Sequence, residues 1–117
     1  MVEKFKKILD KIISGHGAVT LFAVVKMDDL TDKWSIILSA PWSDGDKSQS
    51  AFDAVLALLL ENFDAEERNS IARIGIYDQS EHLIQELLRF KKDTVLENQK
   101  INGNLVHFGY ILESKSS

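Results

Sequence analysis

The feature that most constrains the fold is the run from Lys33 to Trp42, in which apolar residues alternate before a proline. Alternation with a period of two is typical of a β-strand, whose successive side chains point to opposite faces. It predicts that one face carries Trp34, Ile36, Leu38 and Ala40. Pro41 cannot donate a ladder hydrogen bond, so we expect a sheet edge or a strand terminus there. Trp42 follows the last paired residue, where binding surfaces are often built.

Three segments have the periodicity of amphipathic helices. Apolar residues recur at helical spacing from Phe5 to Ile13, from Phe52 to Phe63 and from Leu83 to Leu88. The middle stripe includes Leu56, and Leu58 and Leu60 widen it. Because this stripe is so wide, we expect the second helix to be packed on more than one side.

Three pairs of residues have the spacing of a helix N-terminal cap, in which a side-chain oxygen accepts a backbone hydrogen bond. The pairs are Ser50 with Asp53, Asp64 with Glu67, and Asp78 with Glu81. The first and third pairs are expected to begin the second and third helices. The middle pair predicts a short turn of helix before the next strand.

Four further segments are predicted strands. They are residues 18–27, 71–77, 94–96 and 105–112. Residues 18–27 are apolar on both faces, which indicates a central strand. The charged residues from Asp28 to Asp32 predict a turn between the first two strands, and Asn102 with Gly103 predicts a hairpin turn between the last two.

The resulting order is α-β-β-α-β-α-β-β, which predicts the α+β class. Crossover connections are right-handed, so we expect the third strand to lie parallel to a neighbour while the hairpins add antiparallel pairs. The expected fold is a mixed, mostly antiparallel five-stranded sheet with three helices. With 117 residues, of which 44% are hydrophobic, and no linker, residues 1–117 are expected to form a single domain with a frayed tail at 114–117.

Composition argues against several functional classes. The 14 basic residues are outnumbered by 18 acidic ones, which disfavours nucleic-acid binding. Without cysteine there is no disulfide, thiolate zinc site or cysteine nucleophile. No secretory signal or membrane-spanning run is visible, so we expect a cytoplasmic protein without a membrane partner. Residues 1–11 and 89–117 each carry a net charge of +2, and together they would offer a patch for an acidic partner.

Candidate catalytic residues are few. Asp44, Asp46 and Asp78 would suit a metal-dependent hydrolase if they converge, because carboxylates bind magnesium, and His16 would then be the acid or base. His107 is expected to be half-buried in the last strand. The chain lacks a nucleophile elbow, a phosphate-binding loop and a dinucleotide motif. We therefore expect no cofactor, no metal and no catalytic activity.

Large aromatic residues near strand ends provide the remaining signal. The candidate binding residues are Trp42, Pro41, Trp34, Tyr110 and Phe108. If the uncharged segment 105–112 lies at the sheet edge, it would be an open template for pairing, which predicts a homodimer through the C-terminal strand.

The sequence thus predicts a small regulatory or protein-binding module that recognises another protein, or itself, through a sheet edge and the Trp42 loop. In size and style it resembles compact bacterial accessory proteins, such as immunity or antitoxin-like partners. The alternatives are the hydrolase and a small-ligand sensor with a pocket between the second helix and the sheet.

Overall fold

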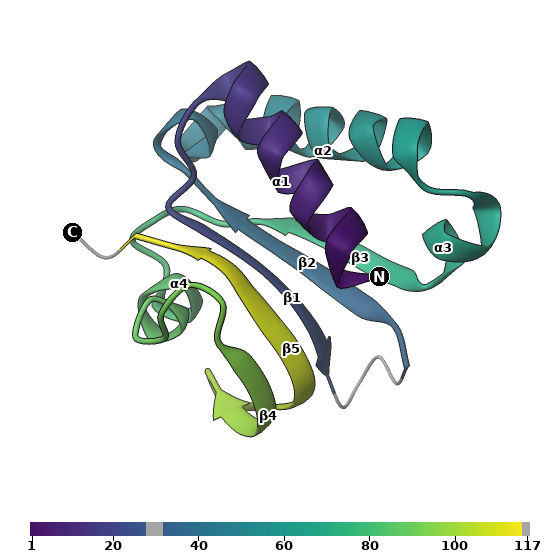
Figure 1. Cartoon of the computed structure of the whole chain (residues 1–117). Coiled ribbons are helices and arrows are strands. Elements are labelled where there is room, and N and C mark those ends of the chain that lie inside the picture. The colour runs from purple at the N-terminus through teal and green to yellow at the C-terminus, as the bar shows by residue number, and fades with distance from the viewer. Residues whose placement is uncertain (28–31, 116–117) are drawn as a thin grey trace.

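The protein forms a five-stranded mixed sheet of order β3-β2-β1-β5-β4 (Figure 1). The computed structural model describes residues 1–27 and 32–115; the predicted turn at 28–31 and residues 116–117 of the tail lie outside them. The strands are β1 (Leu21–Met27), β2 (Trp34–Ser39), β3 (Ile71–Ile76), β4 (Val95–Ile101) and β5 (Asn104–Ser114). β3 runs parallel to β2 and the other pairs are antiparallel, which confirms the predicted α+β sheet.

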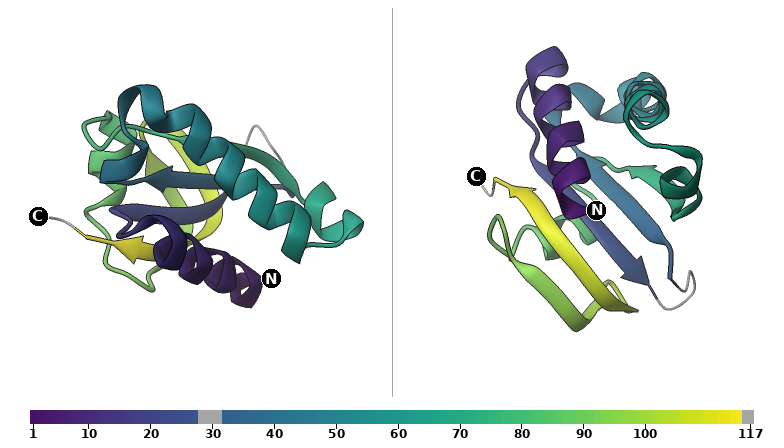
Figure 2. Two further views of the ribbon diagram at one scale, coloured as in Figure 1. Left: turned by 90° about the horizontal axis from the view of Figure 1, so that it is seen from above. Right: turned by 45° about the vertical axis from the view of Figure 1, so that its right-hand side comes forward.

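Four α-helices occupy the described residues, one more than predicted. They are α1 (Val2–His16), α2 (Ser48–Asn62), α3 (Ala65–Asn69) and α4 (His82–Leu87). The additional helix, α3, is the short turn expected from Asp64. Two 3-10 helices, η2 (Pro41–Ser43) and η3 (Gly45–Lys47), follow the end of β2. α1 and α2 cover one face of the sheet, and α4 lies against the other (Figures 1 and 2).

The sheet separates two hydrophobic cores. The larger core packs α1 and α2 against the predicted Trp34 face of β2, whose four apolar residues are all buried. The smaller core packs Leu83, Ile84 and Leu87 of α4 against the opposite face. β1 lies at the centre of the sheet and is buried on both faces, as its continuous apolar sequence predicted.

Only one of the three predicted caps forms. The Asp64 carboxylate accepts from the Glu67 amide at 2.8 Å, and the Glu67 carboxylate accepts from the Asp64 amide at 2.9 Å. The prediction for Ser50 is wrong, because α2 begins two residues earlier, at Ser48. The prediction for Asp78 is also wrong: α4 begins at His82, and the Asp78 side chain accepts a hydrogen bond from a different loop.

The C-terminal strand is internal, so the condition on which the expected homodimer depended, that this strand lies at a sheet edge, is not met. β5 pairs with β1 on one side and with β4 on the other, so the premise of a homodimer through this strand is wrong. The edges of the sheet are β3 and β4. His107 on β5 is exposed, not half-buried. In the described part of the chain, no helix has both the length and the apolar content to cross a membrane.

The predicted hairpin turn between β4 and β5 is present. Asn102 and Gly103 have positive φ angles of 51° and 80°, which is the backbone that such a tight turn requires. Farther along β5, Gly109 allows close approach to β1, because a Cβ at this position would lie 2.9 Å from the Val24 carbonyl oxygen. The turn and this contact together place β5 between its two neighbours.

Candidate functional site

Three of the five predicted binding residues form one aromatic cluster on the sheet. Phe108 and Tyr110 occupy alternate positions of β5 and therefore share a face, with ring centroids 5.1 Å apart. The Trp34 ring at the start of β2 lies 6.4 Å from Phe108 and 6.2 Å from Tyr110. Lys26 on the intervening strand β1 places its ammonium 4.7 Å from the centre of the Trp34 ring, within cation–π range.

This cluster extends from the core to the surface. Trp34 is buried beside Phe5, with a centroid distance of 5.7 Å and an edge-to-face angle of 72°. Phe108 and Tyr110 are half-buried. Val95 on the edge strand β4 pairs with Tyr110 and is 51% exposed. We call the surface formed by Trp34, Phe108, Tyr110 and Val95 the aromatic face.

A groove lies between the aromatic face and α1. One hollow of about 200 Å³ is lined by Val2 and Lys6 of α1 and by Val95, Tyr110 and Leu112 from the sheet. A second hollow, of about 240 Å³, shares Lys6, Asp93 and Leu112 with the first and extends to Lys92. The two segments of net positive charge, residues 1–11 and 89–117, therefore meet along this groove.

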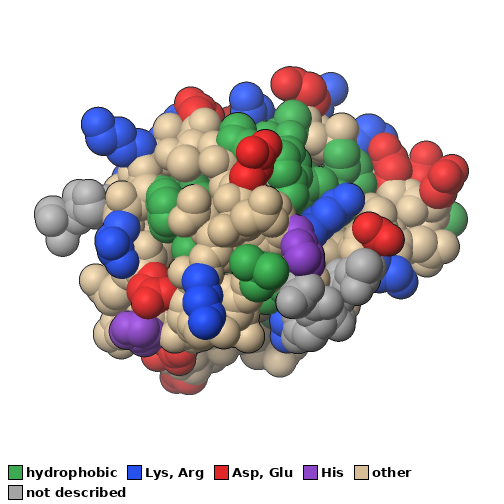
Figure 3. Space-filling model, turned by 90° about the horizontal axis from the view of Figure 1, so that it is seen from below, with side chains coloured by type: hydrophobic (Ala, Val, Ile, Leu, Met, Phe, Trp, Pro, Cys, Tyr) green, Lys and Arg blue, Asp and Glu red, His purple; other side chains and the backbone are tan. Residues whose placement is uncertain are grey.

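Apolar side chains also gather on the outer surface of the molecule. The space-filling view from below shows hydrophobic side chains in several separate areas, with basic and acidic side chains between and around them (Figure 3). This view is of the α4 side of the sheet, whereas Phe108 and Tyr110 pack with α1 on the other side.

The other two predicted binding residues, Pro41 and Trp42, lie beyond the opposite end of β2 in η2. The Trp42 ring stacks on His16 at the end of α1, with centroids 4.9 Å apart, and its Nε1 donates to the Ala18 carbonyl at 3.0 Å. Trp42 is half-buried and packs against the larger core, while Pro41 is exposed. Trp42 thus packs against the C-terminal end of α1 and is not part of the aromatic face.

Two of the candidate carboxylates, Asp44 and Asp78, accept hydrogen bonds that link two loops. Asp44 accepts from the backbone amide and the side chain of Gln79 at 3.0 Å and 2.7 Å. In return, Asp78 accepts from the Gly45 amide at 2.8 Å. Asp46 is exposed and takes part in none of these bonds. Over residues 1–27 and 32–115, no group of three or more histidine or carboxylate side chains is placed to hold a metal ion.

The three histidines are dispersed. His16 stacks on Trp42, His82 lies 2.7 Å from the Asn102 side-chain oxygen, and His107 is on the exposed side of β5. None of them faces the Asp44 and Asp78 carboxylates through a hydrogen bond recorded for the described residues. This arrangement gives no support to the hydrolase alternative.

Lys4 and Glu67 form an ion pair in which the pKa of the Glu67 carboxyl is shifted. The Lys4 ammonium donates to Glu67 at 2.6 Å, which joins α1 to α3. This hydrogen bond, with the second one from the Asp64 amide, lowers the pKa of the Glu67 carboxyl below its usual value. Because Glu67 also completes the cap of α3, its charge stabilises local structure.

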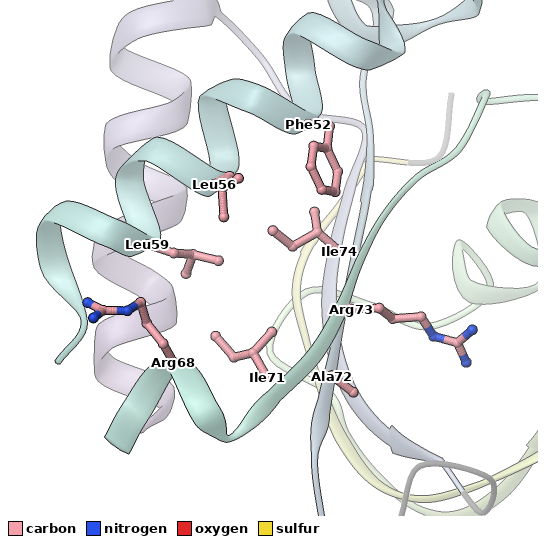
Figure 4. Close-up of a pocket in the computed structure, with 8 residues that line it drawn as sticks. All are labelled: Phe52, Leu56, Leu59, Arg68, Ile71, Ala72, Arg73 and Ile74. Carbon is pink, nitrogen blue, oxygen red and sulfur yellow. The ribbon is translucent and has the colours of Figure 1, made fainter. Parts of the chain in front are cut away.

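A hollow of about 230 Å³ lies between α2 and β3, where a small-ligand pocket was predicted (Figure 4). Its lining includes Phe52, Leu56 and Ile74. Arg73 points to the other side of β3, where its Nε donates to Ser35, and Arg68 donates to the Phe63 carbonyl. The hollow is smaller than the roughly 300 Å³ at which ligand sites usually begin, which does not favour a small-ligand sensor.

Sequence reasoning missed the exposure of two leucines of α2 near this hollow. Leu56 and Leu60 were expected to be buried, but they are 38% and 56% exposed. The unusually wide apolar stripe of α2 was the signal that could have identified it. A stripe of this width contains more apolar side chains than α2 buries against the rest of the protein.

Comparison with known proteins identifies no relative. No protein-family model matches this sequence, and neither a curated protein nor a solved structure is similar to it at a significant level.

Proposed function

We propose that this chain is a small cytoplasmic protein-binding module without a catalytic role, and that its partner docks on the aromatic face. The single observation that carries the proposal is the continuity of the cluster, in which aromatic rings 5.1–6.4 Å apart lead from the buried Trp34 to the surface beside Val95. Large aromatic groups bury much area at low entropic cost and dominate binding energies at protein interfaces.

The shape and lining of the groove favour an amphipathic partner segment with charges of both signs, because Lys6 and Lys92 lie there beside Asp10 and Asp93. Its apolar side chains would pack on Phe108, Tyr110 and Val95, in the direction of the groove beside α1. Its carboxylates would face Lys6 and Lys92, and its basic side chains would face Asp10 and Asp93. Complementary charge of this kind accelerates association and fixes the orientation of the partner.

The cytoplasmic assignment rests on composition. The chain has no cysteine, so its stability does not depend on an oxidising compartment.

The proposal is tested with variants of exposed residues. A partner is captured from the native cells with the immobilised protein and identified, and its affinity for the purified protein is then measured by calorimetry. We expect Val95→Glu to weaken binding at least about tenfold, equivalent to about 1.4 kcal/mol, because it places a carboxylate in the apolar contact with the partner. Lys92→Glu is expected to weaken binding most strongly at low salt.

The matched control is Leu60→Glu, since Leu60 is 56% exposed and Val95 is 51% exposed, but Leu60 lies on α2. It should leave the affinity for the partner unchanged. If Val95→Glu and Lys92→Glu bind normally, the aromatic face is not the docking surface. Loss of binding in Leu60→Glu alone would move the surface to α2.

A further inference from the structure

The edge strand β3 presents unpaired backbone groups. β3 pairs only with β2, and the Tyr77 amide just after it donates to the Leu38 carbonyl of β2 at 3.0 Å. Because backbone groups alternate in direction along a strand, the N–H and C=O groups of Ile74 and Ile76 point away from β2. Among the described residues, no hydrogen bond is recorded to these outer groups.

The two edges of the sheet differ in their protection against pairing. β4 carries Glu97 and Lys100 and has an interruption at Asn98, whose φ is 51°. Charges and irregular backbone are features that block edge-to-edge association. β3 has isoleucine at Ile71, Ile74 and Ile76, and its one charged side chain, Arg73, lies on the face away from α2 (Figure 4). The β3 edge is therefore open to another strand.

An apolar flank of α2 lies above this open edge. Phe52, Leu56 and Leu60 follow one another at a spacing of four residues and so form a stripe along the helix. Phe52 and Leu56 line the hollow against β3, and Leu60 is more than half exposed. A strand added to β3 would bring its own covering helix against this stripe.

We propose that the occupant of this surface is a second copy of the chain. The two β3 strands pair antiparallel about a two-fold axis, which continues the sheet across both protomers and brings the two α2 helices side by side. The Phe52, Leu56 and Leu60 stripes then pack on each other, as an isologous interface requires. This surface is distinct from the aromatic face, so the dimer does not depend on the proposed function.

Charge complementarity favours a second copy in this orientation. Arg68 borders the hollow near the start of β3, whereas Gln49 and Phe52 lie near Ile76 at its end. Asp53, bonded to Gln49, is at that same end. Antiparallel pairing places the Arg68 end of one protomer beside the Asp53 end of its partner, and it does so twice by symmetry.

The oligomeric state tests this proposal directly. We expect sedimentation and light scattering of the purified chain to give a dimer at micromolar concentration. Leu60→Glu should raise the dimer dissociation constant at least tenfold while leaving the circular dichroism spectrum unchanged. Val95→Glu, an equally exposed position on the other edge strand, should remain dimeric. A monomeric wild type, or a Leu60→Glu variant that stays dimeric, would overturn the proposal.

Hydrogen exchange provides a second test, and its measurement on the wild-type chain can be interpreted without a variant. In the wild-type chain, the Ile74 and Ile76 amides should exchange as slowly as the Tyr77 amide, which is bonded to β2. In Leu60→Glu, the first two should exchange quickly and Tyr77 should stay protected. Fast exchange of Ile74 and Ile76 in a wild-type dimer would place the interface elsewhere. Dissociation caused by Val95→Glu alone would assign the dimer to the β4 edge.

Discussion

Trp42 illustrates how a residue's role depends on what it contacts. Its position after Pro41 suggested an exposed recognition group, but its ring stacks on His16 and its Nε1 bonds to Ala18. The proline predicted where the strand ends, and therefore that Trp42 lies just beyond it. The end of α1 and the segment that follows it supply these contacts, and they are more than twenty residues away in the chain.

We expect Trp42→Ala to destabilise the protein by about 2 kcal/mol, because it removes a half-buried aromatic ring and a hydrogen bond. Urea denaturation measures this change. Trp42→Phe is the matched control; it keeps an aromatic ring on His16 and should lose only about 1 kcal/mol. Unchanged stability of Trp42→Ala would mean that this contact does not anchor α1.

Asp78 shows the limit of local capping rules. Its spacing to Glu81 predicted a cap, yet its carboxylate accepts from Gly45, while Asp44 accepts from Gln79. A carboxylate can satisfy any amide that the fold brings within reach, and sequence spacing reveals only the nearby ones. Asp64 kept its predicted cap because Glu67 completes the reciprocal bond within the same turn.

At the scale of elements, periodicity predicted which segments form helices and strands, but not their neighbours. The apolar segment of β5 indicated a strand equally well at an edge or inside the sheet. Its place between β1 and β4 is set by long-range pairing and by the close approach at Gly109. Leu56 and Leu60 were wrongly expected to be buried for the same reason, since their exposure depends on β3 being an edge strand.

Substitutions of two glycines, Gly109 at the β5–β1 contact and Gly15 in α1, should have opposite effects on stability. Gly109→Ala should destabilise the protein by about 2 kcal/mol, since its Cβ would meet Val25 Cγ1 at 2.8 Å and the Val24 carbonyl oxygen at 2.9 Å. Gly15→Ala should stabilise by up to about 1 kcal/mol, since Gly15 lies in α1 with open space around its Cβ position.

Both changes are measured by chemical denaturation. Val25→Ala in the Gly109→Ala background should recover part of the loss, because it removes one of the two contacts. If Gly109→Ala proves as stable as wild type, β5 has room to move away from β1.

For the whole molecule, the fold class followed from the order of elements, whereas the surfaces did not. The sequence placed Trp34, Phe108 and Tyr110 among candidate binding residues, and the sheet brings these three together because β1 lies between β2 and β5. Pro41 and Trp42 had the same chemical character but lie beyond the other end of β2. Strand order decides which aromatic residues become neighbours, and period-two alternation contains no information on strand order.

The proposed dimer through β3 should make thermal stability depend on protein concentration. If β3 pairs with a second copy, only the folded chain forms the dimer, so mass action should raise the melting temperature as protein concentration increases. Leu60→Glu should melt at a temperature independent of concentration, whereas Val95→Glu should behave as the wild type does. Differential scanning calorimetry over a hundredfold range of concentration would measure this dependence. Identical concentration dependence in both variants would contradict a dimer through β3, since of the two residues only Leu60 belongs to α2, the helix beside that edge.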